Sequence, residues 1–129
     1  MKTIYARGAA ADAVAANPTR PATAVIHDTP DARLVVFRIA PGQVVAPHRN
    51  ASTVLLTVLS GSGLVTGGDT EVSVGPGDVI AYARNELHGM RAVNEELVLL
   101  ATITPRPGSR SDVHPLALAT TPADAGRGA

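Results

Sequence analysis

The stretch from residue 42 to residue 61, GQVVAPHRNASTVLLTVLSG, decides the fold that the sequence predicts. A Pro-Gly turn leads into a short apolar run that ends on His48, and a second apolar run follows and closes on Gly61. Aliphatic and β-branched runs bounded by glycine, proline, asparagine and serine are typical of short antiparallel strands. The stretch therefore predicts two strands with a histidine at the turn between them.

A second stretch, residues 75–89, GPGDVIAYARNELHG, repeats this scheme. A Gly-Asp turn at Gly77 and Asp78 leads into a short apolar run, and His88 follows after one more turn. Two single histidines at the ends of two strands predict a shared pocket with few polar groups, which is the usual composition of a small-molecule site.

The first stretch resembles the first motif of the cupins, in which glycine, two histidines, glutamate and glycine recur at fixed spacings. Gly42, His48 and Gly61 match those spacings. Asn50 stands at the position of the second histidine, and Val54 stands at that of the glutamate. Two of the three metal-binding positions of this motif are therefore changed.

The second stretch resembles the second cupin motif, which Gly77, Asp78 and His88 match, with Ala83 where the family has proline. The resemblance covers residues 24 to 105. It implies an all-β fold, the double-stranded β-helix (jelly-roll) barrel of a small single-domain cupin.

Strand-length runs and turn residues at short intervals support the same fold class. We expect an N-terminal extension at 1–23, the cupin barrel at 24–105 and an irregular C-terminal tail at 106–129. In the extension, a short strand over 2–6 and a helical turn or loop over 8–16 are expected. The sequence from the first motif onward predicts strands at 43–48, 53–60, 62–66, 70–74, 78–83, 87–93 and 96–104.

Composition narrows the range of partners. The chain of 129 residues has 11 basic and 11 acidic residues without a basic cluster, so nucleic acid is not an expected partner. It has no cysteine, which removes disulfides and thiolate sites. No apolar run is long enough for a membrane span. We expect a cytoplasmic protein that binds a small molecule and forms a homodimer through edge strands, with Thr3–Ala6 adding to a neighbouring sheet.

Side-chain alternation along the strands predicts which residues face the barrel interior. The inward sets are Val44, Ala46, His48 and Asn50 on the first strand, Val54, Leu56 and Val58 on the second, and His88, Met90 and Ala92 after the second turn. The predicted ligand pocket consists of His48, Asn50, Val54, Leu56, His88 and Met90.

Two interpretations of the histidines follow. The resemblance implies a divalent transition metal such as Zn, Fe, Ni, Mn or Cu, with His48 and His88 as ligands and Asn50 as a possible third. A catalytic metal takes three protein ligands or more, and an amide is a poor one, so we expect at most weak binding. Alternatively, the histidines hydrogen-bond each other, Asn50 or water.

Two functions correspond to these interpretations. One is a cupin that binds a small, largely apolar molecule in the barrel with no tightly held metal. The other is a metal-dependent cupin enzyme of the dioxygenase, isomerase or cyclase type, which uses His48 and His88. The valine at position 54 favours the first.

Four other polar side chains have less specific roles in the predicted fold. Arg38 lies between two apolar neighbours that are expected to face the core in its place. Tyr82 could point into the pocket mouth, or lie on the exterior or at a dimer interface. His27 and His114 are expected to be exposed or structural.

Overall fold

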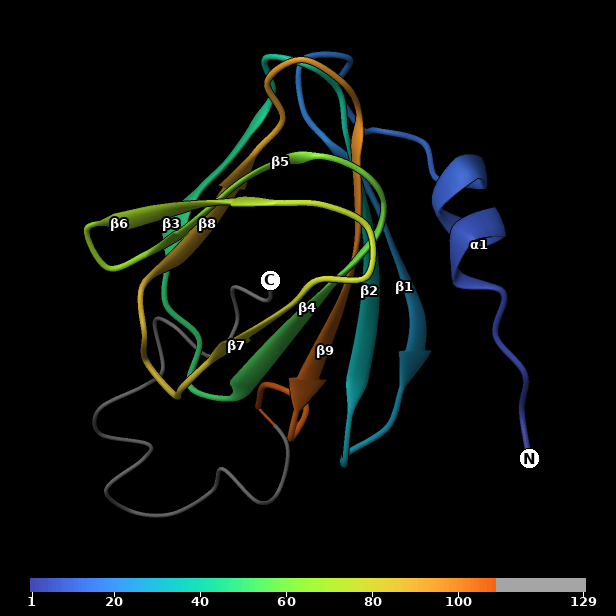
Figure 1. The fold of residues 1–129 in the computed structure, drawn as a ribbon. Coiled ribbons are helices and arrows are strands. Elements are labelled where there is room, and N and C mark those ends of the chain that lie inside the picture. Colours follow the sequence, from blue (N-terminus) through green and yellow to red (C-terminus); the bar gives the residue numbers. More distant parts are fainter. Residues whose placement is uncertain (109–129) are drawn as a thin grey trace.

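The computed structural model describes residues 1–108. Within this range one helix and nine strands follow one another along the chain (Figure 1). The helix is α1 (Ala6–Asp12), and the strands are β1 (Ala22–Asp28), β2 (Arg33–Ile39), β3 (Val44–His48), β4 (Thr53–Gly61), β5 (Gly63–Gly67), β6 (Thr70–Val74), β7 (Val79–Tyr82), β8 (His88–Arg91) and β9 (Leu97–Thr104).

The strands form two antiparallel sheets that enclose one core. The first sheet has the order β1-β2-β9-β4-β7, and the second has the order β3-β8-β5-β6. Consecutive strands such as β3 and β4 lie in different sheets, so the chain crosses repeatedly between the two layers. This is the jelly-roll arrangement, and it confirms the all-β fold class that the sequence predicts.

Alternation along β4 places one of its faces in the core. Val54, Leu56 and Val58 are 1%, 0% and 2% exposed, as the sequence predicts. The cluster that they join is aliphatic apart from a single Phe and a single Tyr, and it holds the two sheets together by apolar burial. Its other members include Phe37, Ile39, Val65, Tyr82, Met90, Ala92, Leu97, Leu99, Ala101 and Ile103.

The N-terminal extension follows the prediction in part: the strand expected over 2–6 is absent, whereas the helix covers part of the helical turn or loop expected over 8–16. Residues 2–5 form no strand, and the alanine-rich run that follows forms α1 instead, because alanine has the highest helix propensity. The helix packs outside the first sheet, where Ala10 contacts a small cluster with Val36 and Val98. The strand-swapping route to a dimer through Thr3–Ala6 therefore loses its structural basis.

Arg38 fixes this helix to the sheet. Its neighbours Phe37 and Ile39 are buried in the core, as expected, so Arg38 points outward. Its Nε donates a hydrogen bond to the carbonyl of Ala10 at 3.0 Å, and a guanidinium NH2 group donates to the carbonyl of Ala13. These carbonyls lie at the C-terminal end of α1, where Arg38 supplies donors to carbonyls that the helix does not fully use; that of Ala10 also accepts from the backbone N–H of Ala13 at 3.3 Å.

One prediction about the first histidine strand is wrong in detail. The pairing of β3 with β8 shifts register between Val45 and His48. As a result Val44, which was expected to face inward, is 54% exposed and Ala46 is exposed too, whereas Val45 packs against the core. Pro47 lies in the irregular segment and has no N–H to offer to a ladder, which is the usual position of proline in a sheet.

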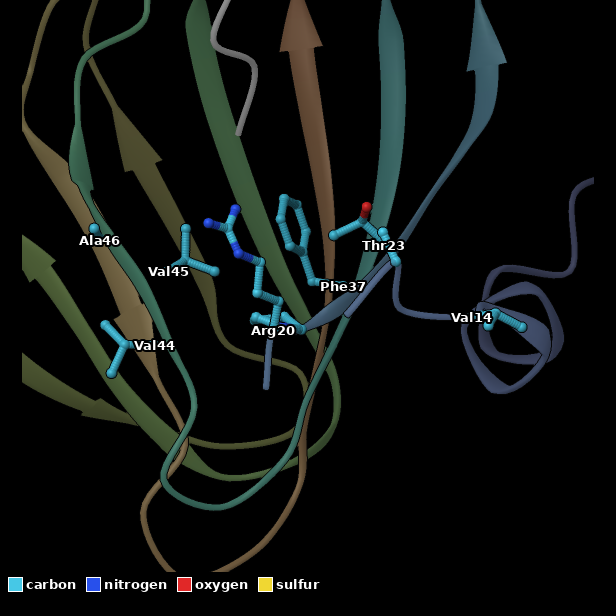
Figure 2. A pocket seen from close by; sticks show the side chains of 9 residues that line it. Val14, Arg20, Thr23, Phe37, Val44, Val45 and Ala46 are labelled. Atoms are coloured by element: carbon cyan, nitrogen blue, oxygen red, sulfur yellow. The ribbon is translucent and has the colours of Figure 1, made fainter. Parts of the chain in front are cut away.

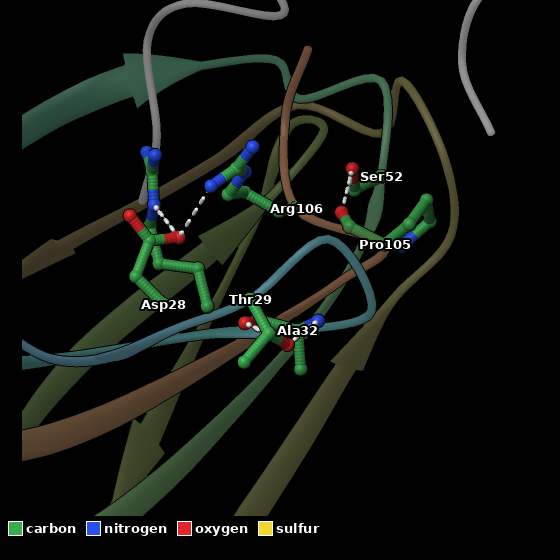
Figure 3. A network of polar contacts seen from close by, with 7 residues as sticks. Asp28, Thr29, Ala32, Ser52, Pro105 and Arg106 are labelled. Atoms are coloured by element: carbon green, nitrogen blue, oxygen red, sulfur yellow. Dashed lines mark hydrogen bonds and ion pairs between the residues drawn. The ribbon is translucent and has the colours of Figure 1, made fainter. Parts of the chain in front are cut away.

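The segment after β9 is attached to the barrel. A guanidinium nitrogen of Arg106 lies 3.6 Å from a carboxylate oxygen of Asp28 (Figure 3). The backbone N–H of Arg106 donates to the carbonyl of Pro30 at 3.2 Å. Ser52 Oγ donates to the carbonyl of Pro105 at 2.6 Å. The predicted tail from residue 109 onward, including His114, lies outside the described residues.

Candidate functional site

His48 and His88 lie side by side, as the two sequence stretches suggested. They are paired across β3 and β8, and their ring centroids are 4.3 Å apart with planes tilted by 55°. His88 is fully buried, and the ring of Tyr82 lies 4.9 Å from it. Residues 40 positions apart in the sequence are thus brought together by strand pairing.

The loop after β3 and the loop before β8 are also joined by hydrogen bonds. The backbone N–H of Asn85 donates to the carbonyl of Asn50 at 2.7 Å, and a guanidinium N–H of Arg49 donates to the carbonyl of Asn85 at 2.8 Å. Asn85 has a φ of 62°, a left-handed conformation that asparagine adopts more readily than most residues. This turn sets the position from which His88 enters the barrel.

The hydrogen bonds of the two rings fix which nitrogen of each ring is free. Nδ1 of His48 lies 2.9 Å from the carbonyl of Ala46, and Nδ1 of His88 lies 3.2 Å from the carbonyl of Glu86. A carbonyl oxygen only accepts, so each Nδ1 carries the hydrogen, and in the neutral ring Nε2 is then an acceptor. Both Nε2 atoms are buried without a partner among the described residues.

Asn50 contributes a hydrogen-bond donor to this region, whereas each histidine Nε2 is an acceptor. Its side chain is 1% exposed, and its Oδ1 accepts a hydrogen bond from the backbone N–H of Ser52 at 2.9 Å. The amide Nδ2, a donor, is buried and has no partner in the described part of the chain. Buried polar atoms rarely stay without partners. We therefore take His48, Asn50 and His88, at the end of β3 and the start of β8, as one candidate site with two unused acceptor nitrogens and one unused NH2 group. We call these three residues the polar trio.

The other residues predicted for the pocket are buried apolar side chains of the core. Val54 is directly opposite Tyr82 in the β4–β7 ladder, and both side chains are buried. Leu56 and Met90 are 0% and 2% exposed and belong to the same core cluster. The sequence left the direction of Tyr82 open; the structure places it inward, where its hydroxyl donates to the carbonyl of Thr66 at 2.8 Å. Burial and the Glu86 carboxylate raise the pKa of Tyr82 to about 12.

A cavity of considerable size lies elsewhere in the described structure. It has a volume of about 750 Å³, opens between β1 and β3, and is lined by Phe37 and Val45 among others (Figure 2). None of the six residues predicted for the ligand pocket lines it. We assign the candidate site to the polar trio all the same, because buried atoms without partners indicate a ligand more directly than volume does.

The donor set does not fit a tightly bound metal. Two imidazole Nε2 atoms with Nδ1 held by carbonyls are typical of metal-ligating histidines. However, the described residues contain no group of three His, Cys, Asp or Glu side chains that could hold an ion. The amide oxygen of Asn50 already accepts a hydrogen bond from Ser52, and the amide nitrogen that is left without a partner among the described residues is no metal ligand. Val54 offers no donor atom.

Burial lowers the pKa of His88, and the neighbouring His48 adds to this effect, while the carbonyl and the charge of Glu86 oppose it. In the unfolded chain a histidine titrates near pH 6.5. Below about pH 6.5 the unfolded state therefore binds a proton that the folded state binds only at lower pH.

The free energy of unfolding should consequently fall as the pH is lowered from about 7 toward 5, and this loss should be smaller in His88→Gln. Urea titrations at several pH values measure it. His27→Gln is the matched control, because it removes a half-exposed histidine on β1, and it should keep the loss. Equal pH dependence in wild type and His88→Gln would show that His88 is not the group responsible.

Comparisons with solved structures agree with the fold. An RmlC-like cupin protein from Desulfovibrio desulfuricans is 27% identical, with a TM-score of 0.69 over 81% of this chain and 97% of that one. KdgF from a Halomonas species is 22% identical, with a TM-score of 0.67 over 74% and 88%. A predicted oxalate decarboxylase from Thermotoga maritima is 23% identical, with a TM-score of 0.63 over 66% and 80%. A search of curated proteins found no match.

The fold and the two paired histidines together define a small protein of the double-stranded β-helix class, with a candidate polar site in its barrel. A family model described as a cupin domain matches residues 35–104, more than half of the sequence. The chain belongs to the cupin family. No helix among residues 1–108 is long and apolar enough to cross a membrane.

Proposed function

We propose that this cupin binds a small, largely apolar molecule whose polar end is held by the polar trio, without a tightly held metal. The observation that carries the proposal is the set of three buried atoms that have no hydrogen-bond partner among residues 1–108: Nε2 of His48, Nδ2 of Asn50 and Nε2 of His88. Leaving such atoms unpaired costs about 1 to 3 kcal/mol each, so a group that satisfies them gains binding energy.

The complementary chemistry of these atoms defines the polar end. Two acceptors and one amide donor suit a group that both donates and accepts, such as a hydroxyl or a primary amide. A hydroxyl donates to one Nε2 and accepts from Nδ2 of Asn50. A carboxylate is a poorer partner for the trio, because neutral imidazole nitrogens already present lone pairs and His88 resists protonation. The aliphatic surround of Val54, Leu56 and Met90 favours an apolar body.

One observation supports the alternative, a metal-dependent enzyme that uses His48 and His88. Both Nδ1 atoms are held by backbone carbonyls, which orients both Nε2 atoms as a metal site requires. The missing third donor counts against it, since a site with two ligands holds a transition metal weakly. We therefore keep metal chemistry as the alternative.

The matched probes phenol and toluene test the proposal. Phenol should shift the Nε2 resonances of His48 and His88 in nitrogen-15 spectra of the histidine rings, and toluene, which lacks the hydroxyl, should shift them much less. Asn50→Leu should remove the difference by deleting the donor. Asn94→Leu, at an exposed position before β9, should preserve it. Equal responses to the two probes, or none at the rings, would contradict the proposal.

Self-association stays a prediction. The expected strand at residues 2–6 is absent, and β1 is one of the four outer strands of the two sheets, with Val25 56% exposed on it. We propose a homodimer that covers the edge of β1, as exposed edge strands are commonly covered.

A further inference from the structure

The large cavity between β1 and β3 shares no lining residue with the polar trio. It lies where the two sheets separate, between an edge strand of each. We propose that this cavity is a second binding site, which takes a small amphiphilic carboxylate, and that Arg20 binds the carboxylate group. The volume of about 750 Å³ lies within the range of about 300 to 1,000 Å³ that is usual for small-molecule sites.

The walls of the cavity are mainly apolar. Phe37 and Val45 face each other across it, from the first and the second sheet (Figure 2). Val44 adds a side chain that is 54% exposed, and Val14 one that is 84% exposed. Apolar surface of this kind gains energy when a hydrocarbon covers it, about 25 cal/mol per Å². The cavity therefore favours a ligand with an alkyl or aryl body.

Arg20 supplies the one charged group in this lining, which contains no Asp or Glu. Its guanidinium extends between Val45 and Phe37 (Figure 2). Among residues 1–108 no ion pair or side-chain hydrogen bond engages it, whereas Arg33, Arg38, Arg91 and Arg106 each have a carboxylate partner. A guanidinium beside apolar walls is a good partner for a carboxylate, because its planar fork matches the two oxygens.

The backbone around Arg20 is held in place, so the guanidinium does not sit on a loose segment. Nε2 of Gln43 donates to the carbonyls of Pro18 and Arg20, both at 3.2 Å. Oε1 of Gln43 accepts from the backbone N–H of Ala40 at 2.9 Å. The backbone N–H of Arg20 donates to the carbonyl of Asn17 at 3.0 Å. These bonds tie the segment 17–20 to the turn before β3, which lowers the ordering cost of binding.

This arrangement separates the two sites by chemistry. The polar trio offers neutral acceptors and an amide, which suit an uncharged polar group, whereas Arg20 offers a permanent positive charge. The cavity and the polar trio are connected through Ala46, which lines the cavity and whose carbonyl accepts the hydrogen bond from Nδ1 of His48. Binding at Arg20 can therefore be lost without loss of binding at the trio.

Octanoate and octan-1-ol, which share an alkyl chain of eight carbons and differ in charge, test the proposal. In calorimetric titration of the full chain, octanoate should bind roughly tenfold more tightly than octan-1-ol, the gain expected for a charge-assisted contact that is partly open to solvent. Arg20→Ala should remove this difference. Arg84→Ala, which deletes an exposed arginine in the turn after β7, should leave it unchanged. Backbone NMR shifts caused by octanoate should centre on Thr23, Phe37, Val44 and Val45.

Several outcomes would overturn the proposal. Equal affinity of the two probes in wild type, with both probes shifting the cavity residues and neither shifting His48 and His88, would show that Arg20 does not recognise the carboxylate. Shifts that centre on His48 and His88 would place the carboxylate at the polar trio instead. Shifts of the cavity residues that grow with protein concentration, with no response to octanoate, would show that a second copy of the chain occupies the cavity. Arg20→Lys keeps the charge and tests the fork geometry: it should retain part of the preference.

Discussion

Gly61→Ala is expected to destabilise the protein by about 3 kcal/mol or more, because it combines a strained backbone with a steric clash. Gly61 ends β4 with a φ of +76°, a conformation that L side chains rarely adopt. A Cβ added there would lie 1.7 Å from the carbonyl oxygen of Glu96 on the chain leading into β9. The clash is with backbone, so one of the two central strands of the first sheet would have to move.

Gly42→Ala is the matched control. Gly42 has a φ of +86°, and nothing lies within 4 Å of an added Cβ, so only the backbone strain of about 1 kcal/mol applies. Urea unfolding followed by circular dichroism measures both changes. Equal losses in the two variants would mean that the contact between Gly61 and Glu96 does not constrain the fold.

Asn50→His combined with Val54→Glu should tighten zinc binding by orders of magnitude. The two substitutions restore donors at the positions where the family has them, next to Nε2 atoms that are already oriented. Without metal the new glutamate lies in the apolar wall beside Tyr82, so the double variant should be less stable than wild type by about 3 kcal/mol. Zinc should recover that stability, since a ligand that binds only the folded state stabilises it.

Asn50→His with Val58→Glu controls for the buried acid. Val58 lies on the same inward face of β4 and is 2% exposed, but it is four residues, about 13 Å, further along the strand. This variant should lose a similar amount of stability and gain no tight zinc binding. Calorimetric titration with zinc measures the affinity of each double variant. Comparable zinc affinity in the two double variants would show that Val54 does not border the polar trio.

The fold could be predicted because the glycine turns and apolar runs that specify its strands are visible in short stretches of the sequence. β4 was expected at 53–60 and runs from Thr53 to Gly61, and β9 was expected at 96–104 and runs from Leu97 to Thr104. The inward face of Val54, Leu56 and Val58 followed from alternation alone. Such features need no knowledge of distant contacts.

Other features depend on contacts that a sequence does not reveal. The register shift before His48 turned Val44 outward, because simple alternation ignores the irregularity that Pro47 brings. The cavity beside Arg20 arises only when β1 and β3, from different sheets, face each other. Proline residues flanking Arg20 mark a turn, yet nothing local shows that Gln43 would hold it. The direction of Asn50's amide likewise depends on the backbone of Ser52.

The metal content of the unmodified protein, purified without added metal and analysed by mass spectrometry of the elements, tests the proposed ligand-binding role most directly. If the polar trio binds an organic polar group through two imidazole acceptors and one amide donor, the protein should carry far less than one transition-metal ion per chain. One ion per chain that survives dialysis against a chelator would contradict this, and would show that His48 and His88 hold a metal with a donor other than the amide nitrogen of Asn50.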